Sequence, residues 1–310
     1  MKETDVVYVL GTGSGWNNNE IRFSLRSIEK YGINVGKIFI VGVLPNFLSP
    51  EVIHIPANDI FIPSVNADGN IILKVLAACA DKRLSEDFLF INDDHVLLKP
   101  IDIARIPAFH KGDMNTFADT FWTFNYWRTR LKRTMETLNE MELPAYHFDC
   151  HTPILFNKKL FPEVISRFDY ATGVGLTMKS LYGNIVYAET GKMLKGEKKK
   201  VFDHLELEQI SQRLANCGFM SFNDSGLNKQ LKMWLYKQFP VRSKWETSDL
   251  EDRYLEILQW LDSDREFMRG VLIFEKYMHG VNLLRMFRSA ENEYLRKKLE
   301  YKLTHAIDDL

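Results

Sequence analysis

Short apolar runs alternate with amphipathic stretches over the first third of the chain. The runs at residues 6–10, 37–43, 52–55 and 88–91 are typical of strands. Between them, Ile21, Leu25 and Ile28 lie at helical spacing before Gly32, and residues 70–80 form the pattern of a buried helix. Strands and helices that alternate in this way favour parallel βαβ units. We therefore predict an α/β fold with a mainly parallel, Rossmann-type sheet flanked by helices.

The pattern is weaker after residue 113. Residues 154–156 and 219–222 indicate further short strands, and the basic stretch 192–200 is predicted to be an exposed loop. Residues 248–310 have helical periodicity almost throughout. We therefore expect one α/β domain over residues 1–246 and a C-terminal helical lobe over residues 247–310.

Composition narrows the class of protein. The chain has 310 residues, 45% of them hydrophobic, and a formal net charge of -1, so global charge does not attract it to nucleic acid or membrane. The three cysteines have no C-x-x-C spacing, which favours a reducing compartment. The first apolar run is too short for a signal peptide, and no run approaches the ~20 apolar residues of a membrane span. We expect a cytoplasmic protein without a transmembrane segment, and its oligomeric state stays open.

Two adjacent carboxylates, Asp93 and Asp94, follow Asn92 between two apolar runs. Like charges side by side at the end of a buried strand are costly unless a cation or a set of donors compensates them. Such carboxylates are well placed to hold Mg²⁺ or Mn²⁺ against a diphosphate. The alternative is an ordinary strand-end turn, in which Asn and Asp are common.

A glycine-rich loop follows the first predicted strand. Gly11, Thr12 and Gly13 would let the backbone approach a phosphate or base closely, although the loop matches neither G-x-G-x-x-G nor a P-loop and can equally be a plain turn. Arg22 and Arg26 share one face of the next helix, where they would either clamp phosphate oxygens or face solvent.

A second set of ionisable residues consists of His147, Asp149 and His151. On an extended segment all three side chains would point to one side, as an acid/base or metal cluster or as structural residues. Asp224 follows Asn223 after another apolar run, where it either completes the metal site or lies in a turn.

Aromatic and basic residues are interleaved at residues 121–133. Trp122 and Trp127 would offer stacking surfaces for sugars or bases, and together with the lysines of 192–200 the stretch would form a track for a polyanion. The alternative is an aromatic stripe facing the core with a solvated basic edge.

Several of these blocks, taken in order, resemble the Stealth family of sugar-phosphate transferases. They are the opening strand at 5–10, the helix at 20–31 with Leu-Arg-Ser-Ile-Glu-Lys-Tyr, Asn-Asp-Asp at 92–94, His-Thr-Pro at 151–153, Phe-Asn-Asp at 222–224 and the segment 239–246. The family is related to the GT-A nucleotide-diphosphosugar transferase fold and builds phosphodiester-linked glycans. The Trp-Val-Asp/Asn-Gly element that normally follows its first strand is replaced here by the glycine-rich loop.

The resemblance implies roles for individual residues. Asp93 and Asp94 would serve metal binding and catalysis, and His151 would act as acid or base. Asp224 would be a further site residue, and Arg242 of the last block would bind substrate.

These observations lead to one main hypothesis and two alternatives. The first is a metal-dependent transferase that moves a sugar or sugar-1-phosphate from a nucleotide-sugar donor to a glycan hydroxyl, with Asp149 or His151 activating that hydroxyl. The second is a GT-A glycosyltransferase that modifies a hydroxymethylated base in DNA, which requires steeply salt-dependent DNA binding. The third is a non-catalytic module that binds glycans or nucleotides.

Overall fold

The computed structural model describes residues 3–247 except 17, 122–124, 203 and 224. The strands are β1 (Thr4–Leu10), β2 (Gly32–Ile33), β3 (Val35–Gly42), β4 (Ile53–Ile55), β5 (Asp87–Phe90), β6 (His95–Leu97), β7 (Ile101–Asp102), β8 (Phe109–His110), β9 (Ile154–Asn157), β10 (Lys192–Met193), β11 (Lys198–Lys200) and β12 (Phe219–Ser221). The α-helices are α1 (Glu20–Tyr31), α2 (Ala67–Ala80), α3 (Tyr126–Glu140), α4 (Leu160–Ile165), α5 (Met178–Val186), α6 (Leu207–Leu214) and α7 (Lys229–Gln238). Short 3₁₀ segments span Ile103–Arg105 and Met114–Phe121.

The central sheet has the strand order β4-β3-β1-β5-β9. β4, β3, β1 and β5 run parallel, and β9 pairs with β5 antiparallel at the edge. The predicted α/β class with a mainly parallel sheet is therefore confirmed. Because β1 lies between β3 and β5, the loops that follow β1 and β5 leave the same edge of the sheet side by side.

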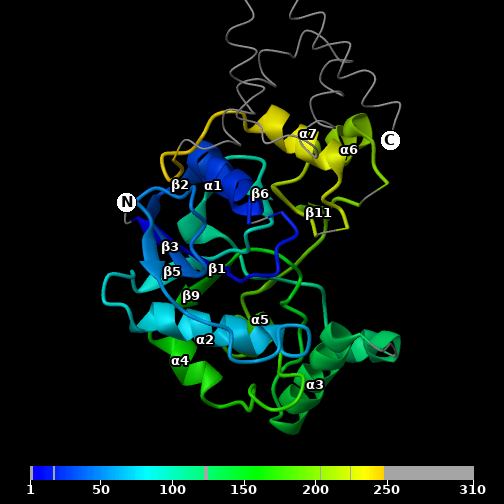
Figure 1. The fold of residues 1–310 in the computed structure, drawn as a ribbon. Coiled ribbons are helices and arrows are strands. Elements are labelled where there is room, and N and C mark those ends of the chain that lie inside the picture. Colours follow the sequence, from blue (N-terminus) through cyan, green and yellow to red (C-terminus); the bar gives the residue numbers. More distant parts are fainter. Residues whose placement is uncertain (1–2, 17, 122–124, 203, 224, 248–310) are drawn as a thin grey trace, which may run out of the picture.

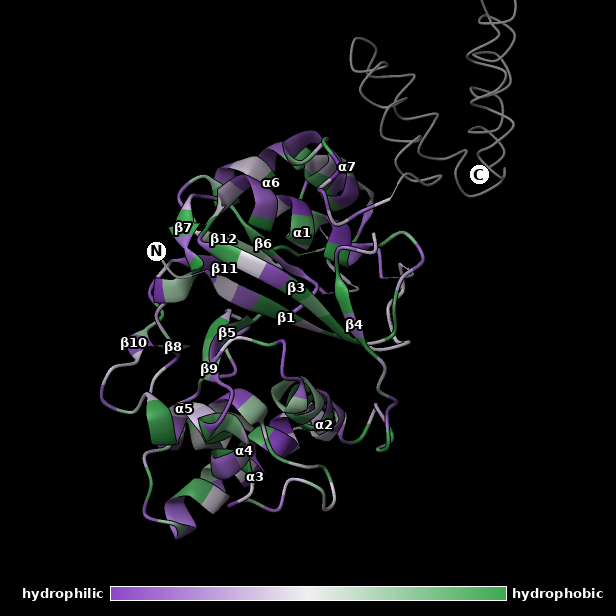
Figure 2. Cartoon of the chain, turned by 90° about the vertical axis from the view of Figure 1, so that its left-hand side faces the viewer, coloured by the Kyte–Doolittle hydropathy of each residue, from purple (hydrophilic) through white to green (hydrophobic). Residues whose placement is uncertain are grey.

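Helices cover both faces of this sheet. Val7 of β1 packs into the cluster that contains α2 and α5, whereas its neighbours Val6 and Tyr8 pack toward α1, as the alternation of a strand requires. Figure 1 shows α1 on one side of the sheet and α2, α4 and α5 on the other, and Figure 2 shows the same layers after a quarter turn. The sequence prediction of helices at 20–31 and 70–80 is confirmed, although α2 begins three residues earlier, at Ala67.

A smaller sheet with the order β11-β12-β6 packs beside α1. β12 pairs antiparallel with β6, and β11 runs parallel to β12. The prediction of an exposed loop over 192–200 is therefore wrong in part, because this stretch contains β10 and β11 and the side chains of Lys198 and Lys200 are half-buried. The prediction failed there because the three consecutive lysines of β11 give no apolar signal for a strand.

The proposed boundary at residue 246 stays a prediction, since the predicted helical lobe falls almost entirely in residues 248–310, outside the described residues. Across the part of the chain that is described, no helix combines the length and apolar character needed to cross a membrane.

Candidate active site

A pocket of about 390 Å³ opens at the carboxyl ends of β1 and β5. The glycine-rich loop after β1 and the acidic turn after β5 meet there, as the sheet order requires. Its lining includes Gly11, Thr12, Gly13, Ser14, Asp59, Pro63, Ala67, Asn70, Lys74, Asn92, Asp93, Asp94, Phe222 and Asn223. The predicted residues of the loop and of the acidic turn therefore face one cavity.

A buried ion pair forms one wall of this pocket. The Lys74 ammonium donates to Asp59 Oδ1 at 2.6 Å and to the carbonyl of Leu10 at 3.0 Å. The side chain of Lys74 is only 4% exposed, whereas that of Asp59 is 24% exposed. The carboxylate is thus anchored from behind and accessible from the pocket, where its remaining acceptor capacity suits hydroxyl or N–H donors of a ligand.

The acidic turn carries a carboxyl group whose charged form is disfavoured. Burial and the charge of Asp93 raise the pKa of Asp94 to about 8. Among the described residues, Asp94 Oδ1 has no hydrogen-bond partner. A buried oxygen atom without a hydrogen-bond donor is a candidate ligand for a cation. A bound divalent ion would stabilise the charged carboxylate and so lower the pKa of Asp94 again.

Two histidines complete a cluster with this carboxylate. His95 Nε2 lies 3.7 Å from Asp94 Oδ1, and His151 Nδ1 lies 3.9 Å from Asp94 Oδ2. One ligand atom from each of the three residues lies within 4.8 Å of the others. Burial strongly lowers the pKa of His95, which keeps the ring neutral, and neither of its nitrogens has a hydrogen-bond partner among the described residues. These atoms fit a metal ion.

The backbone holds His151 in an unusual conformation. Its φ of 55° lies in the left-handed region, which non-glycine residues rarely adopt and which is often found at functional sites. Its neighbours are fixed, since Cys150 Sγ contacts the Phe109 carbonyl and Thr152 Oγ1 at 3.2 Å each. The strained position turns a half-exposed imidazole toward Asp94.

Two lysines supply positive charge around the cluster. Lys179 is buried in the first turn of α5, donates to the Thr152 carbonyl at 2.8 Å and lies 3.4 Å from Asn92 Oδ1. Desolvation lowers the pKa of Lys179, and desolvation together with Lys111 lowers that of Lys198 to about 8. Desolvation and both lysine charges lower the pKa of His151, although water screens part of this effect because the ring is half-exposed.

The arginines predicted to clamp phosphate lie elsewhere. Arg22 and Arg26 are buried on α1 and pair with the fully buried carboxylate of Glu246, at 3.2 and 2.7 Å. Neither of them lines the pocket, and the exposed Arg242 does not line it either. The spacing of Arg22 and Arg26 correctly put them on one helix face, but that face packs against the segment around Glu246.

The structure does not place His147, Asp149 and His151 on one side of a strand. Asp149 instead accepts hydrogen bonds from the backbone and hydroxyl of Ser180, at 2.8 and 2.6 Å, at the start of α5. His147 is buried, and its ring centroid lies 5.9 Å from that of Trp127. The segment is irregular, so the alternation expected of an extended strand does not apply.

The remaining predicted site residues are Trp122, Trp127 and Asp224. Trp127 lies in the first turn of α3 and lines a second hollow next to the main pocket. Trp122 and Asp224 lie outside the described residues, although Asn223 lines the main pocket. The two stretches proposed as a polyanion track belong to different parts of the fold, because α3 packs on α5, whereas β10 pairs with β8 and β11 pairs with β12 (Figure 1).

Sequence reasoning missed His95, Lys74 and Lys179. His95 directly follows the acidic pair, so its position alone could have indicated it. Lys74 and Lys179 are each the only charged residue within an otherwise uncharged stretch, at 70–80 and 176–185. A lone charge inside a buried helix needs a partner, and that signal could have found both.

Comparisons with known proteins give limited likenesses. No protein-family model matches the sequence, and no curated protein matches it. The solved apo structure of the bifunctional glycosyltransferase WbbM is 15% identical, with a TM-score of 0.45 over 79% of this chain and 50% of that chain. The galactosyltransferase LgtC, solved with donor and acceptor sugar analogs, is 7% identical, with a TM-score of 0.43 over 78% of this chain and 98% of that chain.

Our chain therefore spans about half the length of the WbbM chain. At such TM-scores and identities these likenesses assign neither fold nor function, so the α/β class rests on the sheet itself. The resemblance to the Stealth family stays a prediction.

Proposed function

We propose that this protein is a metal-dependent transferase of the GT-A type that uses a nucleotide-sugar donor and an acceptor hydroxyl of a glycan. One observation carries the proposal: the glycine-rich loop, the Asp59–Lys74 pair and the acidic turn line one pocket, with the Asp94, His95 and His151 cluster at its edge. Backbone loops and anchored polar groups at the carboxyl end of a parallel sheet suit a nucleotide.

Of the two ions predicted from the sequence, the cluster fits Mn²⁺ better than Mg²⁺. Asp94 offers an oxygen and the two histidines offer nitrogens, whereas Mg²⁺ takes mostly oxygen ligands. When bound, the ion would neutralise the diphosphate and stabilise the departing nucleotide. In this assignment His151 holds the metal instead of acting as acid or base. We assign Lys198, whose charge lowers the pKa of Asp94, in place of the predicted arginines as a cation for the phosphates.

The proposed chemistry is a single displacement. Asp93 lines the pocket beside Asp94, and we assign it to accept the proton of the acceptor hydroxyl. Attack on the β-phosphorus would break the bond between the two phosphates, transfer sugar-1-phosphate and release a nucleoside monophosphate, as the Stealth resemblance implies. Attack on the anomeric carbon would transfer the sugar alone and release a nucleoside diphosphate.

A two-stage experiment tests the proposal. A thermal-shift screen of nucleotide sugars with and without Mn²⁺ identifies the donor, because stabilisation grows with ligand concentration over Kd. Mass analysis of the products with that donor then separates the two displacements. Released monophosphate with a phosphate-bearing product supports the Stealth-type reaction, whereas released diphosphate supports plain sugar transfer. Failure of every nucleotide sugar to stabilise the protein or turn over would contradict the proposal.

A further inference from the structure

A second hollow, of about 470 Å³, adjoins the main pocket. It is lined by Pro63, Ser64, Ala67, Asn125, Tyr126, Trp127 and Arg130. Pro63 and Ala67 also line the main pocket, so the two hollows share an edge at the start of α2. A ligand in the second hollow would therefore face a ligand in the first.

The lining combines aromatic faces with hydrogen-bonding groups. Tyr126 is 53% exposed and Trp127 37% exposed, although both are large rings at the start of a helix that packs on the core. Ser64 and Asn125 lie beside them. A pyranose carries C–H groups on its faces and hydroxyls around its rim. The aromatic rings suit such a face, and the nearby polar groups suit the hydroxyls of the rim.

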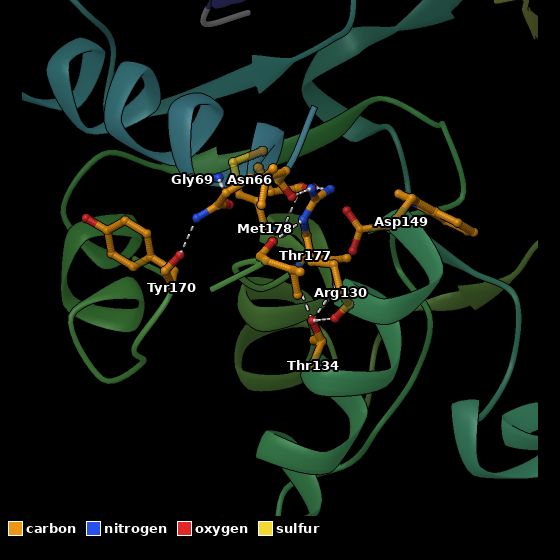
Figure 3. Close-up of polar contacts among 12 residues, drawn as sticks. Asn66, Gly69, Arg130, Thr134, Asp149, Tyr170, Thr177 and Met178 are labelled. Atoms are coloured by element: carbon orange, nitrogen blue, oxygen red, sulfur yellow. Dashed lines mark hydrogen bonds and ion pairs between the residues drawn. The ribbon is translucent and has the colours of Figure 1, made fainter. Parts of the chain in front are cut away.

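The rings are mounted on a rigid frame. Arg130 extends from α3 to the first turn of α2, where it contacts Asp68 at 2.6 Å. Figure 3 shows Arg130 between α3 and the start of α2, near Asn66 and Gly69. It also donates to the carbonyls of Val65 and Val174, at 2.7 Å each, so two separate segments, one around residues 65–68 and one at Val174, are tied to α3. Asn125 caps the helix by accepting from the amide of Trp127 at 2.9 Å. A site held in this way loses little entropy when it binds a ligand.

Local ion pairs neutralise much of the positive charge of α3. Arg130 pairs with Asp68, Lys132 with Glu136 at 3.6 Å, and Arg133 with Asp169 at 3.6 Å. A polyanion binds through cations that exchange small counterions for phosphates, and paired cations contribute less to that exchange. The hollow therefore favours an uncharged ligand over DNA.

We propose that this second hollow is the acceptor subsite and that it binds a neutral pyranose ring stacked on Tyr126 and Trp127. The inference rests on the proposed function and adds to it the class and the place of the acceptor. The shared edge at Pro63 and Ala67 directs a hydroxyl of that ring toward the donor pocket. Neither aromatic residue takes part in the chemical step.

The test measures sugar binding and donor binding separately. The probes are the methyl α- and β-pyranosides of glucose, galactose, mannose and N-acetylglucosamine. Their binding to the full chain is measured by saturation-transfer NMR. Donor binding is the Mn²⁺-dependent thermal shift given by UDP, GDP, CDP or ADP. The variants are Tyr126→Ala, Trp127→Ala and Trp127→Phe, and Phe202→Ala is the control, because Phe202 is 41% exposed and lines neither hollow.

We expect at least one pyranoside to bind the native protein. Each alanine variant should weaken that binding roughly three- to tenfold, in line with the loss of one stacked ring. Trp127→Phe, which keeps a ring against His147, should retain most of the affinity and the native melting temperature. Phe202→Ala should bind the pyranoside as the native protein does, and all variants should keep the nucleotide-dependent shift.

One set of results overturns the inference while the proposed function stands: nucleotide binding without binding of any pyranoside, or with pyranoside binding that the alanine variants do not change. Duplex DNA binding that salt weakens and Trp127→Ala abolishes would overturn the inference and also the glycan acceptor of the proposed function, while the nucleotide-sugar donor would stand. Pyranoside binding that depends on Trp127 without binding of any nucleoside diphosphate would instead contradict the proposed function and leave a sugar-binding site.

Discussion

Replacing Arg26 with methionine should destabilise the fold and leave nucleotide binding intact. The Arg26 guanidinium lies against the Glu246 carboxylate at 2.7 and 2.9 Å and donates to the Phe239 carbonyl at 3.2 Å. Both side chains are almost completely buried. The pair joins α1 to the segment that precedes residue 247, and it lies outside the pocket.

The size of the effect follows from what remains around Glu246. Removing one partner of a buried ion pair costs about 3–5 kcal/mol, since it leaves a charge without compensation. Here Arg22 and the amide and hydroxyl of Ser243 still donate to the carboxylate. We therefore expect a loss near the lower end, about 3 kcal/mol, and a fall in melting temperature of about 6–12 °C.

Thermal unfolding of Arg26→Met, with and without Mn²⁺ and a nucleoside diphosphate, measures both quantities at once. The matched control is Arg105→Met, which removes a 78% exposed arginine that pairs with Asp102 at 3.4 Å and should change the melting temperature little. A variant that melts like the native protein but loses the nucleotide-dependent shift would refute the reasoning and restore Arg26 as a phosphate ligand.

Two further predictions concern buried polar groups. Lys74→Met should weaken the binding of a nucleoside diphosphate about tenfold, as measured by calorimetry, because the Asp59 carboxylate in the pocket wall loses its 2.6 Å contact with Lys74. Unchanged affinity would show that Asp59 and Lys74 do not contribute to nucleotide binding. Burial lowers the pKa of His147 to about 4, although the charge of Asp149 acts in the opposite direction. Between about pH 6.5 and pH 4, this residue therefore binds a proton in the unfolded chain but not in the folded chain. Stability should thus fall as pH falls through this window, by up to about 3 kcal/mol from this residue, and urea unfolding of His147→Phe should show a flatter pH profile than the native protein; identical profiles would contradict the assignment.

The sequence predicted the first half of the fold well. The strands at 6–10 and 88–91 and the helix at 20–31 are confirmed nearly residue for residue, because each is a run with one clear periodicity bounded by glycine or polar residues. The joint position of Gly11 and Asp94 also followed from the sequence, since strands of one parallel sheet end at one edge.

The second half was harder to predict for physical reasons. β11 consists of lysines, and pairing with β12 rather than apolar content holds it in place. Partners that are distant along the chain decide other roles, as when Glu246 occupies Arg22 and Arg26 from more than 200 positions away. The left-handed backbone of His151 cannot be read from side-chain spacing, and it changed which residues meet at Asp94.

Direct measurement of Mn²⁺ binding tests the central claim, that Asp94 and its two histidines hold the ion of a nucleotide site. Calorimetric titration should show one Mn²⁺ per chain, bound more tightly when a nucleoside diphosphate is present. Asp94→Asn should weaken that binding about 100-fold or more, while Asp87→Asn, at the exposed start of β5, the strand before the acidic turn, should leave it unchanged. Equal Mn²⁺ affinity in the native protein and Asp94→Asn, or no Mn²⁺ binding with any nucleotide, would contradict the account.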